Sequence, residues 1–183
     1  MHIFLTGEIR IGKSTALRRF LQDTGISADG FLTEFDSHGD IRKLYIKRFD
    51  TETARTEQRL VAKMSSSGAE VFAEVFDVFG TGCLAAAGKR KLIIMDELGK
   101  FEESCPLFTE AVICRLNGSI PVMGVIKMRE SPFLKMVREH PSVEVIMVTK
   151  ENRDNIPALL AEQLGISTLA TVNVNKKQDN LSR

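Results

Sequence analysis

The residues whose types and spacing have the clearest chemical meaning form a run of eight near the start of the chain. They are Gly7-Glu8-Ile9-Arg10-Ile11-Gly12-Lys13-Ser14. Glycines let a backbone curl so that successive N–H groups point at one phosphate chain. Lysine adds a cation for the outer phosphates, and serine offers a hydroxyl to Mg²⁺. We therefore predict a phosphate-binding loop that continues into Thr15 and in which Ser14 is a metal ligand.

The residues on either side of this run supply the context that the motif needs. The run His2–Thr6 is typical of a short buried strand, and apolar residues recur at helical spacing over Thr15–Leu21. A strand, a glycine-bearing loop and a helix in this order favour anion binding, because the N-terminus of the helix adds a partial positive charge.

A second group of chemically meaningful residues ends the apolar run Lys91–Glu97. Asp96 closes this predicted buried strand, where a carboxylate can hold Mg²⁺ opposite Ser14. Glu97 follows, and it can accept a proton from an attacking water. Four apolar residues followed by an acid pair form a Walker B pattern. The alternatives are a strand-end cap for Asp96 and a surface acid for Glu97, with Glu102 or Glu103 as the base.

The transition state of phosphate transfer needs positive charge beyond Lys13 and Mg²⁺. The sequence offers several candidates and does not choose among them, because each is also an ordinary surface cation. They are Arg10 within the loop, Lys100 after the acid pair, Lys127 and Arg129 after a later strand, and Arg153 after the last strand.

Strands alternate with helices along the rest of the chain. Expected strands cover 2–6, 30–35, 41–49, 91–97, 120–126 and 143–148, and expected helices cover 15–21, 69–87, 106–116, 132–139 and 151–164. The run 69–87 is either one helix or two pieces interrupted at Gly80-Thr81-Gly82, and Pro157 either kinks the last helix or lies near its start. This alternation predicts an α/β fold with a mostly parallel central sheet flanked by helices. The runs 30–35 and 41–49, about a turn at 36–40, predict an antiparallel hairpin at one edge. The polar span 50–67 suggests a connection with one helix.

Length and composition narrow the class of protein further. With 183 residues we expect one domain over 1–183, with a partly frayed tail from about 165. A net charge of +1 provides no field that attracts nucleic acid. Apolar runs are too short for a membrane span, and Met1 leads directly into a strand, so we expect no signal peptide. Three cysteines without metal-ligand spacing indicate reduced, largely buried thiols and a cytoplasmic protein.

Four segments of the chain resemble the thermophilic nucleoside-triphosphate phosphatases, also called cancer-related nucleoside-triphosphatases. They are Phe4–Thr15, Asp29–Glu34, Ile94–Glu102 and Val148–Arg153. The segments occur in the order and spacing of that family. Asp-Glu-Leu-Gly-Lys-Phe-Glu and Thr-Lys-Glu-Asn-Arg are more specific than the phosphate loop, which many families share.

The resemblance implies a RecA-like P-loop fold and slow, Mg²⁺-dependent hydrolysis of ATP, GTP and other triphosphates to diphosphate and phosphate. It also implies a second nucleotide-linked segment, which consists of Leu92, Ile93, Ile94, Met95, Asp96, Glu97, Leu98 and Gly99. Glu8 and Arg10 depart from the family, whose loop carries prolines or small residues there. Glu8 opposes phosphate binding unless Arg10 neutralises it.

Two family segments need a physical role. Glu34 either approaches the Mg²⁺ shell or is a surface acid. Lys150 and Arg153 follow the last strand, where ligands bind in open α/β sheets. Their side chains either lie on a nucleotide base of any kind or are solvated beside a helix that Thr149 caps.

Two other classes of function use the same loop. One is a nucleotide or small-molecule kinase, against which the sparse basic residues after 126 and the acid pair argue. The other is an ATPase switch stimulated by a partner, and the lack of an aromatic-basic stripe argues against a nucleic-acid partner. We expect a monomer or a weak homo-oligomer whose partners are nucleoside triphosphates.

Overall fold

The structure, a computed structural model, describes residues 1–36, 40–52 and 57–169. Contacts between Cα atoms divide the chain into two compact units, 1–6 with 27–146, and 7–26 with 147–183. The expectation of one domain stays a prediction.

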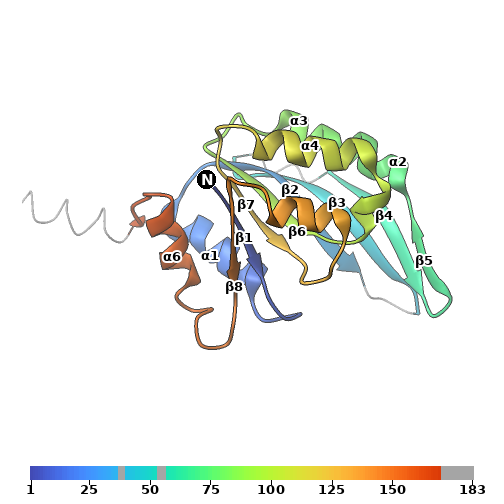
Figure 1. The fold of residues 1–183 in the computed structure, drawn as a ribbon, viewed down its shortest axis with the longest axis horizontal. Coiled ribbons are helices and arrows are strands. Elements are labelled where there is room, and N and C mark those ends of the chain that lie inside the picture. The colour runs from blue at the N-terminus through green and yellow to red at the C-terminus, as the bar shows by residue number, and fades with distance from the viewer. Residues whose placement is uncertain (37–39, 53–56, 170–183) are drawn as a thin grey trace, which may run out of the picture. The chain divides into compact units, whose positions relative to one another are not determined.

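The first unit is built on an eight-stranded sheet with the strand order β5-β4-β3-β2-β6-β7-β1-β8 (Figure 1). Strands β2, β6, β7 and β1 run parallel to one another. Their bounds are β1 His2–Thr6, β2 Ala28–Asp36, β6 Leu92–Leu98 and β7 Val122–Ile126. At one edge lies β8, Val143–Met147, whose last residue is assigned to the second unit. Buried apolar runs in β1, β6 and β7 are typical of parallel strands covered on both faces.

The antiparallel part of the sheet is larger than the predicted hairpin. β2 pairs with β3, Arg42–Asp50, as the sequence predicts. Residues 37–39 of the predicted turn lie outside the described residues. β4, Gln58–Ser65, and β5, Gly68–Val71, then add two further antiparallel strands. The predicted helix within 50–67 is therefore wrong for 58–65, because pairing with β3 overrides the weak local pattern.

The helices of this unit pack on the sheet, and buried residues of both form one hydrophobic core. These helices are α2 Ala73–Val75, a π-helical turn Phe76–Gly80, α3 Thr81–Ala86, a 3₁₀ turn Phe101–Ser104, α4 Pro106–Leu116 and α5 Pro132–Arg138. Figure 1 shows α3 and α4 side by side. The ring of Phe108 lies 5.4 Å from that of Phe31 and 5.3 Å from that of Phe76, which ties α4 and the π-helical turn to β2. The helix expected over 69–87 is thus a strand followed by three short helical pieces.

In the described part of the second unit, helices α1 Lys13–Thr24 and α6 Ile156–Gln163 pack on each other. The buried side chains of α1 include Ala16, Leu17 and Phe20, the apolar stripe that its sequence predicts. α6 begins five residues later than expected, because residues 151–155 form turns. Most of the expected tail lies outside the described residues. In the part of the chain that the structure describes, no helix is long and apolar enough to cross a membrane.

Candidate functional site

The phosphate loop of the second unit has the conformation that its glycines predict. Gly7 has φ +140°, and a Cβ atom there would lie 2.5 Å from the carbonyl oxygen of Val148. Only glycine fits this close approach between two backbones. Helix α1 begins at Lys13, whose Nζ donates hydrogen bonds to the carbonyl oxygens of Gly7 (2.9 Å) and Glu8 (2.7 Å). The lysine therefore folds back over the loop and stabilises its curl.

The two residues that depart from the family pattern point into solvent. Glu8 and Arg10 are exposed, and Arg10 has a left-handed backbone with φ +64°. Within the described residues these two side chains make no ion pair with each other. Glu8 is therefore not neutralised by Arg10 in this conformation.

The segment that follows β8 also approaches the loop within the same unit. A Cβ atom on Gly12 would lie 4.0 Å from Cδ of Arg153, so the arginine stem passes beside the loop. Asn152 holds this segment in a turn, since its Oδ1 accepts from the N–H of Thr149 and its Nδ2 donates to the carbonyl of Met147. The interpretation of Thr149 as a helix cap is wrong, because the residue at the cap of α6 is Asn155. Lys150 is exposed.

The acid pair ends strand β6 in the first unit. Asp96 is 5 % exposed and pairs in register with Val125 of β7. The register shifts between Asp96 and Leu98, so Glu97 is the extra residue of a bulge, and the peptide bond before it is cis. The backbone N–H of Glu97 donates to a side chain of the neighbouring strand β2, Oγ1 of Thr33 (3.1 Å). Bulges re-aim side chains in this way.

The carboxylate of Glu97 is held by a lysine from the neighbouring strand end. Nζ of Lys127 lies 2.9 Å from Oε1 of Glu97, and it also lies 5.5 Å from the centre of the Phe35 ring. Lys127 follows β7, and Arg138 on α5 donates to its carbonyl oxygen and to that of Arg129 (3.0 Å). The sequence offered Lys127 as a candidate cation, and Thr33 lies in the family-like segment Asp29–Glu34, but the sequence gave no role for Thr33 and no signal for Phe35 or Arg138.

A second carboxyl group lies close to the same lysine. Glu102 is 2 % exposed, and burial raises its pKa to about 7, although the charge of Lys127 opposes this shift. Its Oε2 has no hydrogen-bond partner among the described residues. A buried acid with such a pKa is a protonatable group near neutral pH.

The remaining predicted residues have ordinary surroundings. Glu34 is exposed and forms an ion pair with Lys47, which favours its interpretation as a surface acid. Lys100 is exposed, with Nζ 5.0 Å from the centre of the Phe101 ring. The side chains from Leu92 to Met95 are buried core residues, so in this segment only Asp96 and Glu97 offer polar side chains.

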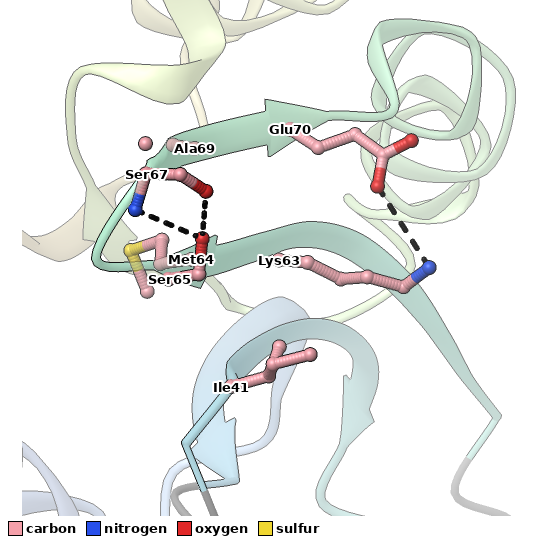
Figure 2. A pocket seen from close by; sticks show the side chains of 8 residues that line it. Ile41, Lys63, Met64, Ser65, Ser67, Ala69 and Glu70 are labelled. Carbon is pink, nitrogen blue, oxygen red and sulfur yellow. Dashed lines mark hydrogen bonds and ion pairs between the residues drawn. The ribbon is translucent and has the colours of Figure 1, made fainter.

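A surface hollow of the first unit lies away from all of these residues. Figure 2 shows it between the β4–β5 hairpin and Ile41, with the ion pair of Lys63 and Glu70 at one end and linked Ser65 and Ser67 at the other. It contains no residue that the sequence predicts for the site. Cys83 and Cys105 are buried thiols as expected, whereas Cys114 is exposed.

A glycine-rich loop between a strand and a helix, with an acid pair at the end of a buried parallel strand, defines a P-loop nucleotide-binding protein. A family model described as NTPase matches residues 2–161. The chain belongs to this NTPase family, and it is therefore an enzyme of the nucleoside-triphosphatase class.

Individual relatives agree with this assignment. The chain is 28% identical to the nucleoside-triphosphatase THEP1 of Natranaerobius thermophilus, over 89% of this chain and 96% of that protein. It is 29% identical to the human cancer-related nucleoside-triphosphatase, over 85% and 92% of the two chains. The crystal structure of THEP1 from Aquifex aeolicus superposes with a TM-score of 0.72 at 26% identity, covering 90% of this chain and 99% of that one.

Proposed function

We propose that this protein hydrolyses nucleoside triphosphates of any base to the diphosphate and phosphate, in the presence of Mg²⁺. The observation that supports this most is the topology of the parallel strands. β1, β7 and β6 are parallel, so their carboxyl ends share one edge of the sheet. Thr6, the last residue of β1, directly precedes the phosphate loop in the chain, so the strand that leads into the loop ends at the same edge of the sheet as the acid pair of β6.

In this proposal each group has one task. The backbone N–H groups of residues 7–15 and the ammonium of Lys13 bind the phosphates. The hydroxyl of Ser14 and the carboxylate of Asp96 are oxygen ligands of the kind that Mg²⁺ prefers, and these two residues would hold it. When bound, the metal ion supplies positive charge to the phosphate oxygens.

Glu97 is the proposed base. Its side chain is 23 % exposed, and Nζ of Lys127 contacts Oε1. The attacking water gives its proton to this carboxylate as its oxygen bonds to the γ-phosphorus, and the bond from that phosphorus to the bridging oxygen breaks. Arg10, Lys100 and Arg153 remain candidates for the additional positive charge on the phosphates. Lys150 and Arg153 are candidates for a contact with the nucleotide base of the substrate.

Broad base choice rests on the kind of contact that these two residues offer. Stacked on the face of a nucleotide base, the Lys150 stem and the Arg153 plane would not contact the edge by which one base differs from another. A cation or an aliphatic stem that lies on the face of a ring accepts any base.

Phosphate release from ATP, GTP, CTP and UTP, with and without Mg²⁺, tests the proposal. We expect Lys13→Ala to weaken triphosphate binding about tenfold or more, because a cation on the phosphates is lost. Glu97→Gln keeps binding but lowers kcat about 10²- to 10⁴-fold, the usual contribution of a general base. Glu139→Gln, which alters an exposed acid of α5, is the matched control and stays at the wild-type rate. Normal turnover of Glu97→Gln would show that another group is the base.

A further inference from the structure

The ion pair between Glu97 and Lys127 joins two groups whose backbones are both fixed. The N–H of Glu97 donates to Thr33. The N–H of Lys127 donates to the carbonyl of Leu98 (3.0 Å), and Arg138 binds the Lys127 carbonyl. With both backbones held, the ion pair restricts how the two side chains extend from them.

A second carboxyl group, that of Glu102, lies near Lys127. A Cβ atom on Gly99 would lie 3.3 Å from Cδ of Lys127, 3.6 Å from its Nζ, and 3.5 Å from Oε2 of Glu102. The ammonium and this unpartnered, buried oxygen thus face the same small space above Gly99. A Cβ atom at position 99 would contact both groups.

We propose that Lys127 is the positioning residue that orients Glu97 for the attacking water, and that Glu102 competes with Glu97 for the Lys127 ammonium. The inference rests on the proposed function, in which Glu97 is the base. It extends that function by two residues: Lys127, which orients the carboxylate of Glu97, and Glu102, which competes for the Lys127 ammonium.

The geometry favours positioning over direct contact with phosphate. The ammonium lies 2.9 Å from Oε1 of Glu97, so its charge is already engaged by the carboxylate, and a carboxylate with one such partner keeps lone pairs that can accept from a water. Fixing one carboxylate oxygen restricts the torsions of a flexible side chain, and orientation of this kind contributes to rate without contributing to substrate binding. Loss of the lysine is therefore expected to lower kcat and to leave KM unchanged.

The competition depends on the charge of Glu102. The charged or titratable groups that face its carboxyl are Lys127, Glu97 and the Cys105 thiol. Burial raises the pKa of Glu102 to about 7, and that of Cys105 to about 11, so only Glu102 of these two changes charge between pH 6 and pH 8.5. The neutral acid attracts Lys127 weakly at pH 6, whereas the anion attracts it strongly at pH 8.5.

The first test is a double-mutant cycle on kcat, with triphosphate affinity and thermal stability measured in parallel. We expect Lys127→Met to lower kcat at least about tenfold with KM within about twofold of wild type, and Lys127→Arg to recover part of the rate. In the Glu97→Gln background, Lys127→Met changes kcat by less than about twofold, because a residue that acts through Glu97 has nothing left to orient. Lys135→Met removes a lysine from an exposed ion pair with Glu139, and it serves as the matched control.

A full additional loss in the Glu97→Gln background would overturn the positioning role, since Lys127 would then act on the phosphate itself. Unchanged kcat in Lys127→Met, with wild-type hydrolysis intact, would also overturn it. Absence of phosphate release from the wild-type protein is a different result, because it refutes the proposed function and this inference together.

The second test addresses Glu102 through a pH profile. We expect the ratio of kcat for Glu102→Gln to kcat for wild type to rise from about one at pH 6 to about threefold or more at pH 8.5, because only the wild type acquires the competing anion. Taking the ratio cancels the titration of groups that both proteins share. A ratio that is flat or falls with pH, in a variant whose thermal unfolding shows it to be folded, would overturn the competition.

Discussion

The close approach of Gly7 to Val148 predicts a defined loss of stability for Gly7→Ala. Alanine at φ +140° is strained, by about 1–3 kcal/mol for backbone regions that are nearly exclusive to glycine. The new Cβ would also lie 2.5 Å from the Val148 oxygen. Two backbone segments must then move apart, and overpacking of this kind costs about 1–3 kcal/mol more.

Gly68→Ala is a control that separates the cost of the clash with Val148 from the cost of the backbone strain. Its φ is +137°, close to that of Gly7, but a Cβ there would meet nothing within 4 Å. The strain and the effect of alanine on the unfolded chain are therefore similar in both variants. We expect Gly7→Ala to be less stable than Gly68→Ala by about 1–3 kcal/mol, the contribution of the clash alone.

Urea unfolding followed by circular dichroism measures this difference, provided that the slope of the transition is the same in both variants. Gly7→Ala should also bind triphosphate more weakly, because the curl of the loop depends on this contact, whereas Gly68→Ala should bind normally. Equal unfolding free energies for the two variants would refute the argument, since they would show that the loop relaxes away from Val148 at no cost.

Two further predictions concern stability and pH. His2 is 1 % exposed, its Nδ1 accepts from the N–H of Val122, and burial lowers its pKa below 6.5. The native state then binds fewer protons than the unfolded state, so His2 destabilises the fold as pH falls below 6.5, and urea unfolding of His2→Gln should depend less on pH from 7.5 to 5. Glu102 acts in the opposite direction, because its raised pKa of about 7 makes the native state retain a proton. Its contribution is lost as pH rises from 4.5 through 7, so the stability of Glu102→Gln relative to wild type should increase over that range, by about 3 kcal/mol at most; a constant difference would contradict the assigned burial.

The sequence by itself determined the parts of the site whose residues are adjacent in the chain, namely the phosphate loop and the acid pair. The phosphate loop needs glycines and a lysine at fixed spacing between a strand and a helix, and all of these are adjacent in the chain. The same is true of the acid pair of β6. A continuous apolar run predicts a buried strand, and the two acids that follow it indicate where that strand reaches the edge of the sheet. The parallel strands and the hairpin of β2 and β3 follow from patterns of the same range.

Tertiary structure alone decided which distant residues surround Glu97. Thr33 and Lys127 lie 64 and 30 positions from it in the chain, and no local pattern links them to it. Glu102 lies in the same family-like segment as Glu97, but only the fold buries it. A bulge of one residue aims Glu97, and pairing with β7 brings the lysine to it. Strand β4 was missed for the same reason, since its pattern is weak and its partner supplies the hydrogen bonds. Short-range spacing specifies which chemical groups are available, whereas strand pairing and burial decide their orientation and their charge.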